Sequence, residues 1–559
     1  MRIGASGLGS YALMGGRSQL ALVAACGMVI LACGPFPPDQ SRPARPINLQ
    51  QRGLSTAILQ AVHLGTAGPD TQIHLNLGLK VRRATELTSL LATGRTLSSE
   101  AYAAEFGPDP ALARSAVMAL SSLGFRATWR PGLTQIAVDG PAPMAASLLG
   151  IDIENYRLAD GTTFYASLDQ PRIPPQLATI VSTASGLDSY THWQSSAVRP
   201  GGLTPSDVAA FYNLRPLRDR GLDGSGETIV LPEVDDLPTL EDLNKFAATY
   251  GLPPFDLQIK RDPSWGTPVR PVGEVSMDLQ IIHEIAPKAK LIVYMSSLTG
   301  ADVERAFDQL VNDHLGSIIS QSIGVCERQT TSGYRSTWIT MEDRAVAQGM
   351  SHFVATGDTG AYECGFDTGP VAQFPSTLPT VTAVGGTTVF QSLSGAYLKE
   401  MAWTAPIDET ATGGGSSVFY PLPDYQKRVA QVSGKGMRQV PDVAADADPT
   451  TGVHEFFGGM ADQGGGTSAA APLWAATMAL INQDLKRKGL REAGFANPAL
   501  YWMGENSSKL PAPPFHDVTS GNNLADAAGP GWDFATGWGS MDGAALDQAW
   551  TIYIKGGGA

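Results

Sequence analysis

The spacing of apolar residues divides the chain into two parts of different architecture. In the first part, from about Leu54 to Tyr190, strand-like alternation and helical spacing follow one another and predict a small α+β unit. Asp109 followed by Pro110 is a typical helix start, with a capping side chain before proline at the first helical position. The expected elements are a strand at 73–79, helices at 85–92, 110–123 and 142–149, strands at 125–129 and 134–138, and a hairpin region at 156–172.

In the second part, from Thr204 onward, short apolar runs alternate with helical stretches. Alternation of this kind predicts an α/β domain with a parallel sheet covered on both faces. The sequence Thr204-Pro205-Ser206-Asp207 has the signature of the first helix of this part. Between the two parts, Ser182 to Gly202 has few apolar positions and is interpreted as a linker. The expected strands are 227–231, 291–294, 317–320 and 352–355, with helices such as 240–250 and 301–311 between them.

The N-terminal segment has the pattern of an export signal. Arg2 and Arg17 precede an apolar stretch from Leu20 to Ala32, which is short for a membrane-spanning helix but typical of a signal peptide. Its end, Ile30-Leu31-Ala32-Cys33-Gly34, resembles a bacterial lipoprotein cleavage box, and Val23-Ala24-Ala25-Cys26 is a competing match. We expect a protein that is secreted or held in the bacterial cell envelope, with membrane attachment only through a lipid on Cys33. An ordinary secretory signal cleaved nearby is the alternative.

Composition narrows the class of partner. Hydrophobic residues make up 43% and charged residues 16% of the 559 residues, which indicates a globular chain, and the formal net charge of −14 argues against nucleic acid as a partner. An acidic balance suits an acidic medium, where protonation brings the net charge toward zero. Beyond the signal only Cys326 and Cys364 remain. In an exported protein they are a plausible single disulfide, and they are too few for a zinc cluster.

A candidate nucleophile follows a run of glycines. Gly464 to Pro472 reads Gly-Gly-Gly-Thr-Ser-Ala-Ala-Ala-Pro and leads into an apolar helical run from Leu473 to Ile481. The glycines permit a tight turn, and Ser468 then lies in the first helical turn, where free N–H groups favour negative charge. Ser468 is therefore the candidate for covalent catalysis. A glycine turn capped by Thr467 or Ser468 is the structural alternative.

The candidate base is a carboxylate. None of the eight histidines lies in the His-Gly-Thr-His context of subtilisins. Glu274 and Asp278 are four residues apart on an amphipathic helix, so both lie on one face, and their repulsion and partial burial would raise the pKa of Glu274. Asp358, flanked by glycine at the end of an apolar strand, could donate a hydrogen bond to an oxyanion while it is protonated. The alternatives are a solvated acidic helix face and a simple turn.

Together these segments resemble the sedolisin family of serine-carboxyl peptidases, including kumamolisin-like enzymes. The family's Glu-x-x-Leu-Asp pattern falls on Glu274 and Asp278, its oxyanion aspartate on Asp358, and its nucleophile on Ser468. Four positions depart from the usual motifs without touching a reacting group, namely Met277, Thr356, Thr359 and Gly465. The resemblance implies an acid endopeptidase of subtilisin-like fold that acts on proteins or peptides, with Glu274 as base, Asp278 supporting it, and Asp358 at the oxyanion.

The same resemblance implies a calcium ion and an activation propeptide. The Ca²⁺ ligands would be the Asp517 and Asp533 side chains with the carbonyls of Val518, Gly529 and Gly531. A ferredoxin-like propeptide would act as an intramolecular inhibitor, removed by cleavage between about Ser189 and Thr204, and we expect a monomer. The expected divisions are a signal at 1–33, a linker at 34–51, the propeptide at 52–190, a processing linker at 191–203 and the peptidase domain at 204–559.

Two other classes of function remain open from the sequence. The first is a catalytically inactive, calcium-stabilised surface lipoprotein used for binding. The second is a histidine-dependent serine hydrolase with a neutral pH optimum.

Overall fold

A computed structural model of the chain describes residue 58 and residues 61–93, 95–158, 161, 163–190, 202–268, 273–392, 394–405, 409–432 and 434–556. The expected signal, the linker at 34–51, Cys33 and nearly all of the processing linker lie outside these residues. Within the described part, no helix has the length and apolar character needed to cross a bilayer.

The N-terminal part is built on a four-stranded antiparallel sheet in the order β3-β4-β2-β7. Two helices connect the strands in the sequence β-α-β-β-α-β, the ferredoxin-like arrangement that the resemblance implied. The Asp109 carboxylate caps α4 by accepting from Ala111 N and Leu112 N, as Asp109-Pro110 predicts. The bounds are β2 (Gln72–Leu79), α4 (Pro110–Ser122), β3 (Arg126–Thr128), β4 (Gln135–Pro141), α5 (Ala142–Leu149) and β7 (Val181–Ser185).

Strand β2 has two different faces because successive side chains point to opposite sides of a sheet. Ile73, Leu75 and Leu77 are buried in the core that this unit forms with its own helices. Of the residues between them, Asn76 contacts the second part of the chain, while His74 pairs with Asp139 of its own sheet. The remaining elements of the first part are β1 (Val62–Thr66), β5 (Glu154–Arg157) and β6 (Thr163–Ala166), which form a three-stranded sheet, and helices α2 (Ala84–Ala92) and α3 (Ser99–Glu105).

The prediction of a linker at 182–202 is wrong for its first residues, which form a strand. Residues Val181–Ser185 form β7, which pairs antiparallel with β2 at the edge of the sheet. Only Val181 and Ala184 supply apolar side chains to this strand, so its pattern is too short to distinguish from a polar linker. Backbone hydrogen bonds to β2, and not an apolar pattern, make this segment a strand.

The second part has an eight-stranded sheet in the order β16-β15-β13-β11-β8-β10-β9, with β21 also paired to β15. The pairs are parallel except β15 with β16, which confirms the predicted α/β class. The bounds are β8 (Thr228–Val234), β9 (Asp256–Lys260), β10 (Lys290–Ser296), β11 (Ile318–Gln321), β13 (Ser351–Ala355), β15 (Thr382–Gln391), β16 (Tyr397–Ala402) and β21 (Val443–Asp446).

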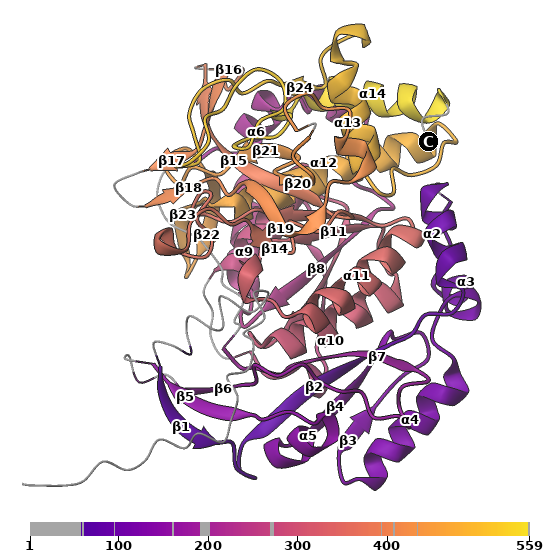
Figure 1. Ribbon diagram of the computed structural model, residues 1–559. Helices are drawn as coiled ribbons and strands as arrows, with labels where there is room; N and C mark the ends of the chain where they lie inside the picture. The colour runs from indigo at the N-terminus through magenta and orange to yellow at the C-terminus, as the bar shows by residue number, and fades with distance from the viewer. Residues whose placement is uncertain are drawn as a thin grey trace, which may run out of the picture. The chain divides into compact units, whose positions relative to one another are not determined.

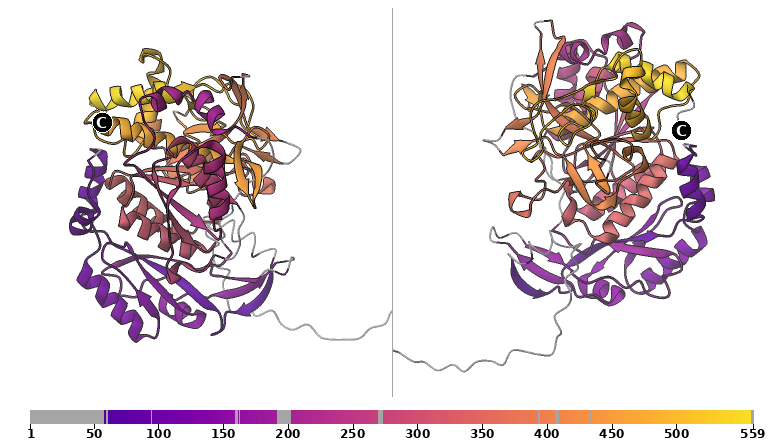
Figure 2. Two further views of the ribbon diagram at one scale, coloured as in Figure 1. Left: turned by 180° about the vertical axis from the view of Figure 1, so that it is seen from behind. Right: turned by 45° about the horizontal axis from the view of Figure 1, so that its top comes forward.

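Helices cover both faces of this sheet (Figures 1 and 2). Ile229 and Leu231 of β8 pack on one face with α9 (Glu274–Ile285) and α12 (Thr467–Arg487). Val230, between them, packs on the other face with α10 (Gly300–Asp313) and α11 (Ser332–Ala347). This alternation separates two hydrophobic cores within one domain.

Helix α11 has no counterpart among the predicted helices. It lies between α10 on one side and β7 and α2 of the first part on the other, so it has little solvent face, and Glu342 and Arg344 are buried along with Trp338 and Met341. A helix buried on several sides loses the amphipathic spacing by which a sequence reveals it.

Smaller elements complete the second part. The helices are α6 (Pro205–Phe211), α7 (Arg215–Asp219), α8 (Leu240–Tyr250), α13 (Asn497–Glu505) and α14 (Gly543–Lys555). Helix α6 starts where Thr204-Pro205-Ser206-Asp207 predicts, and Thr204 and Asp207 form a capping box there. The strands are β12 (Val325–Cys326), β14 (Gln373–Phe374), β17 (Thr404–Ala405), β18 (Thr410–Ala411), β19 (Gly415–Pro421), β20 (Met437–Val440), β22 (Val453–Phe457), β23 (Met460–Gly464), β24 (Phe515–His516) and β25 (Ser540–Met541).

Candidate active site

Ser468 lies in the first turn of α12. Each of the three glycines before it is required for a different structural reason. Gly466 has φ 85°, a backbone conformation that a side chain resists. A Cβ on Gly464 would lie 2.3 Å from the sulfur of Met277, and one on Gly465 would lie 2.7 Å from the backbone of Pro449. The glycines therefore allow α12 to start against α9. Ser468 is 2% exposed, and its hydroxyl donates to the backbone carbonyl of Ser322 at 3.1 Å.

Glu274 and Asp278 lie on α9, which packs directly against α12. Every residue of α9 is buried, so the two carboxyls are not part of a solvated acidic face. Burial, and next the charge of Asp278, raise the pKa of Glu274 well above its usual range, while an interaction with the Ser468 hydroxyl lowers it. Glu274 is thus the carboxyl beside the nucleophile.

Asp278 is connected to the nucleophile through Ser322, which follows β11. The Ser322 hydroxyl donates to Asp278 Oδ2 at 2.5 Å and also lies 3.1 Å from the Ser468 carbonyl. Burial raises the pKa of Asp278 to about 8, although hydrogen bonds from Ser322 and Glu233 act to lower it. The Glu274 and Asp278 pair therefore retains a shared proton to higher pH than two free carboxyls would.

Glu233 is a third carboxyl that the sequence predictions missed. It lies near the end of β8, is 1% exposed, and is close enough to Asp278 for the two carboxyls to influence each other's charge. Burial, followed by the charges of Asp278 and Glu274, raises its pKa well above the usual range. A lone glutamate inside the apolar run Ile229 to Val234 was the available signal, because a charged residue is rarely buried without a partner.

Asp236 is a second residue that the predictions missed. Its Oδ2 accepts from Gly273 N at 3.0 Å and from Val275 N at 3.1 Å. These are the free N–H groups at the start of α9, so Asp236 caps the helix that carries Glu274.

Asp358 follows β13 at the carboxyl edge of the sheet, where parallel-sheet proteins place their sites. Its Oδ1 accepts from Thr467 N at 2.7 Å and from Thr467 Oγ1 at 2.9 Å. Thr467 is the neighbour of Ser468, so these bonds tie Asp358 to the start of α12. The structure thus brings together all four residues that the sequence selected, Glu274, Asp278, Asp358 and Ser468.

The histidines that the structure describes have other partners. His63 pairs with Glu154, His74 with Asp139, His352 with Glu342 and His454 with Tyr250. His283 contacts the Pro253 carbonyl, His516 contacts Ser540, and His314 contacts the backbone of Gln348. A serine without a neighbouring histidine can still act as a nucleophile when a carboxylate beside it serves as the general base.

Comparison with known proteins places this site in a family. The family model described as "Pro-kumamolisin, activation domain" matches residues 59–190. The model described as "Subtilase family" matches residues 270–539. Kumamolisin from Bacillus sp. (strain MN-32) is 32% identical over 535 residues, which cover 88% of this chain and 94% of kumamolisin. The chain belongs to the sedolisin family of serine-carboxyl peptidases.

Other sedolisin-family members agree. Sedolisin from Pseudomonas sp. (strain 101) is 29% identical over 535 residues, covering 87% of each chain. The solved structure of Pseudomonas sedolisin, a serine-carboxyl proteinase complexed with two molecules of pseudo-iodotyrostatin, matches with a TM-score of 0.57 at 31% identity, covering 64% of this chain and 99% of that one. This member of the sedolisin family is therefore a serine peptidase with an N-terminal activation domain.

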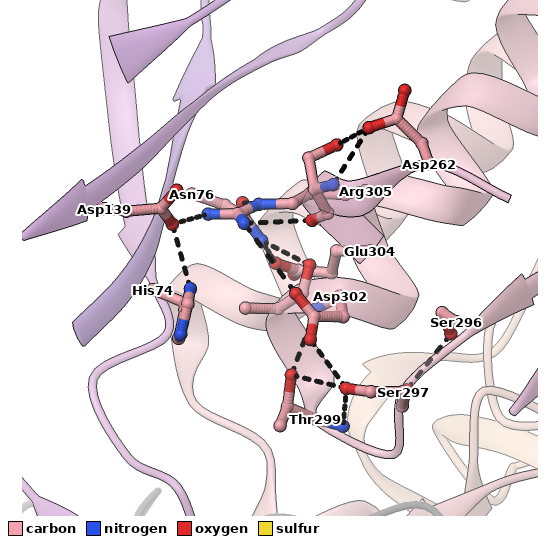
Figure 3. A network of polar contacts seen from close by, with 12 residues as sticks. His74, Asn76, Asp139, Asp262, Ser296, Ser297, Thr299, Asp302, Glu304 and Arg305 are labelled. Atoms are coloured by element: carbon pink, nitrogen blue, oxygen red, sulfur yellow. Dashed lines mark hydrogen bonds and ion pairs between the residues drawn. The ribbon is translucent and has the colours of Figure 1, made fainter. Parts of the chain in front are cut away.

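The activation domain contacts the peptidase domain through α10 (Figure 3). Arg305 Nη2 donates to Asp139 Oδ1 at 2.9 Å, and Arg305 Nε donates to Asn76 Oδ1 at 3.0 Å. Glu304 Oε2 accepts from Asn76 Nδ2 at 2.6 Å and from Ser185 Oγ at 2.7 Å. Burial is the largest influence on Asp139 and raises its pKa, but the hydrogen bonds from His74 and Arg305 outweigh it and hold the pKa below the usual range.

Cys326 and Cys364 form a disulfide, the pairing that the sequence left open. It connects the segment after β11 to the loop after Asp358.

The loop expected to bind calcium has a suitable donor set. Both oxygens of Asp517 accept from Gly531 N at 3.1 and 3.0 Å, and Asp533 Oδ2 accepts from Gly529 N at 3.0 Å. Burial raises the pKa of Asp517, and raises that of Asp533 to about 6. No ion pair among the described residues supplies either carboxyl with a positive charge.

These residues fit a hard cation. The described residues include no cluster of three or more His, Cys, Asp or Glu side chains that could hold a metal ion, and this loop offers two carboxyls, Asp517 and Asp533. Carboxylate and carbonyl oxygens are the ligands that Ca²⁺ prefers.

Proposed function

We propose that the chain is an exported acid endopeptidase, made as a zymogen that processes itself, in which Ser468 forms the acyl-enzyme. One observation carries the proposal. The nucleophile at the start of α12 has as its ionisable neighbour a buried carboxyl, Glu274, whose pKa is raised by burial and by the charge of a second buried carboxyl, Asp278.

In the proposed reaction, Ser468 Oγ attacks the carbonyl carbon of the scissile peptide bond and Glu274 accepts the hydroxyl proton. A carboxyl of raised pKa is a better proton acceptor than a free glutamate. Asp278 shares the proton of this pair, which titrates as a unit. Glu274 then returns the proton to the leaving amine, the C–N bond breaks, and a water molecule activated by Glu274 hydrolyses the ester.

Asp358 stabilises the oxyanion in this scheme. Because Oδ1 accepts two hydrogen bonds from Thr467, a proton on the carboxyl would lie on Oδ2 and could be donated to the developing charge. A carboxyl donates only while it is protonated, so this step requires acid. The N-terminus of α12 adds further positive potential.

The first part of the chain, proposed as residues 52–190, serves as activation propeptide and inhibitor. Its docking on α10 holds the activation domain on the peptidase domain until cleavage at about residues 189–204. Maturation would follow acidification, because acid makes the site competent. A Ser468→Ala chain that still processed itself in isolation would exclude self-processing.

Ca²⁺ is proposed to stabilise the C-terminal loop through the Asp517 and Asp533 carboxylates and the carbonyls of Val518, Gly529 and Gly531. Bound there, it would neutralise the buried Asp533 carboxylate and the more exposed Asp517 carboxylate. It would have no part in the reaction itself.

Export and lipid attachment at Cys33 are proposed from the N-terminal sequence. Labelling with a fatty-acid analogue tests this. Label that disappears in Cys33→Ser supports attachment there, whereas absent or persistent label excludes it.

Hydrolysis of an unfolded protein between pH 3 and 8 tests the function. We expect activity in acid that is lost in Ser468→Ala and in Glu274→Gln. A neutral optimum would instead favour a histidine-dependent hydrolase, and a folded, calcium-stabilised chain without activity would favour a binding protein.

A further inference from the structure

The turn that carries Asp358 is held in place from several sides. On the nucleophile side, Thr467 donates to the Asp358 carboxyl, and Gly357 N donates to Thr467 Oγ1 at 3.0 Å. On the opposite side, Gly413 N donates to the Gly357 carbonyl at 2.8 Å and Ala411 N donates to the Asp358 carbonyl at 2.9 Å. These contacts are backbone or near-backbone bonds, which position the turn as a rigid unit.

Glu363 contacts this turn on both sides of Asp358. Its Oε1 accepts from Thr359 N at 2.9 Å. Its carboxyl also packs on Gly357, since a Cβ built on Gly357 would lie only 2.3 Å from the carboxyl carbon and 2.4 Å from either oxygen. Gly357 has φ 97°, so glycine is needed there both for its conformation and for the space that Glu363 occupies.

Glu363 is itself fixed by covalent and backbone contacts. Its N–H donates to the Val371 carbonyl at 3.2 Å, and Tyr362 N donates to the Thr359 carbonyl at 3.2 Å. The next residue, Cys364, is joined to Cys326. The carboxyl therefore has little freedom to leave the turn, and the disulfide loop acts as its support.

The protonation state of Glu363 suits an enzyme that works in acid. Burial raises its pKa to about 8, and the Asp358 charge contributes to the rise while the Thr359 N–H opposes it. Glu363 is therefore neutral over the whole acid range. Its carbonyl oxygen still accepts from Thr359 N, and a glutamine would imitate this form closely.

We propose that Glu363 is a positioning residue, which fixes the Gly357–Thr359 turn so that the Asp358 carboxyl stays on Thr467 where the oxyanion forms. This inference rests on the proposed role of Asp358. Glu363 contacts neither the nucleophile nor, in this scheme, the substrate. Its effect is confined to the transition state, in which charge develops on the oxygen, and small displacements of an oxyanion donor are costly.

Steady-state kinetics of the acid-matured enzyme on an unfolded protein and on a peptide test the inference. We expect Glu363→Ala to lower kcat by about 10- to 100-fold at unchanged KM, because an interaction made only in the transition state is lost. Glu363→Gln should stay within about 2-fold of the parent. Asp367→Ala, an exposed residue of the same loop, is the matched control and should leave both constants unchanged.

Thermal unfolding distinguishes a positioning role of Glu363 from a role in folding. Glu363→Gln should unfold at the same temperature as the parent. A change in KM, in the preferred cleavage sites, or an equally inactive Glu363→Gln would overturn the inference. A second test combines Glu363→Ala with Asp358→Ala. If Glu363 acts through Asp358, the double variant has the kcat of Asp358→Ala alone.

The double variant also distinguishes the two levels of proposal. Additive losses of kcat would overturn the positioning role and leave the function of Asp358 intact. An Asp358→Ala enzyme with the parent kcat would overturn the role of Asp358 and this inference with it.

Discussion

The hydroxyl of Ser322 donates to Asp278 Oδ2 at 2.5 Å, and the same hydroxyl reaches the carbonyl of Ser468 at 3.1 Å. Ser322 thereby connects the supporting carboxyl on α9 to the backbone of the nucleophile on α12. Since it belongs to neither helix, its position depends on where β11 ends in the sheet.

Ser322→Ala should therefore reduce catalysis without unfolding the enzyme. A hydrogen bond to a charged group contributes about 1.5–3 kcal/mol, so we expect kcat to fall by about 10- to 100-fold with little change in KM. Loss of this donor should also raise the pKa of Asp278 further, because Ser322 acts to lower it. A pH profile of kcat measures both effects.

Ser320→Ala is the matched control for that variant. Ser320 lies on β11, is buried, and its hydroxyl has no hydrogen-bond partner in the described part of the chain. Its removal should leave kcat unchanged. Equal losses in the two variants would mean that general packing, and not the Asp278 contact, is responsible.

Arg305 should dominate the attachment of the activation domain. Its side chain is 5% exposed and contacts Asp139 and Asn76 of that domain. Removing one partner of a buried ion pair costs about 3–5 kcal/mol. Arg305→Leu in a Ser468→Ala chain should therefore make the activation domain markedly more sensitive to limited proteolysis at neutral pH.

Arg130→Ala provides the comparison at the same interface. Arg130 pairs with Asp262 at 2.8 Å, but its side chain is 55% exposed. An exposed pair contributes about 0–1 kcal/mol, so the proteolysis rate should barely change. Similar rates for the two variants would show that burial of Arg305 adds nothing to docking.

The zymogen should lose stability as the pH rises, and Glu304 should account for part of the loss. Burial raises the pKa of Glu304 to about 8, with Arg305 acting in the opposite direction. A carboxyl whose folded pKa is raised contributes stability below its unfolded pKa of about 4.3, and this is lost as the pH rises to 8. The slope for one such group is at most about 1.4 kcal/mol per pH unit.

Urea unfolding of the Ser468→Ala chain at pH 5, 6.5 and 8 measures this slope. Glu304→Gln removes the titrating group, so its midpoint should fall less steeply than that of the parent. Glu86→Gln, on an exposed side chain of the same zymogen, should keep the parent slope. Parallel curves for the parent and Glu304→Gln would contradict the prediction.

Because the stability from Glu304 is present in acid, acidification does not weaken the Glu304 contacts. This agrees with release of the activation domain by cleavage of the chain and not by titration of Glu304.

Chelation should destabilise the mature enzyme if the C-terminal loop binds Ca²⁺. A ligand that binds only the folded state raises its stability by mass action, so a chelator should lower the unfolding temperature by several degrees. Asp533→Ala should unfold at the lower temperature and no longer respond to the chelator. An unchanged unfolding temperature in the parent, with no calcium by elemental analysis, would refute the site.

Local patterns were sufficient for much of the fold. The strands at 73–79 and 352–355 and the helices at 110–123, 142–149 and 240–250 are confirmed to within a residue or two, because each has a clear run or spacing of apolar residues within a few positions. The strand β7 and helix α11 were missed. Both lie against a second part of the chain, and a contact that is distant in sequence leaves no local periodicity.

The candidate site shows the same division. Glu274 and Asp278 were found because their spacing of four residues is a property of one helix. Glu233 and Ser322 were not found, because each comes from a different strand and joins Asp278 only when the parallel sheet brings the strand ends together. Glu363 contacts the turn of Asp358 through a loop supported by a disulfide, which no spacing indicates.

By itself the sequence determined the residue types of the chemistry and their local presentation. Glycines before Ser468, a carboxyl pair one helical turn apart, and an aspartate after a strand are consequences of backbone conformation over a few residues. Only the tertiary structure decided the environment of these groups. Burial of α9 between α12 and the sheet raises the pKa values of Glu274 and Asp278, and packing of the activation domain on α10 buries Glu304 and Arg305. Desolvation depends on what surrounds a group in space, and that is set by contacts between segments hundreds of residues apart.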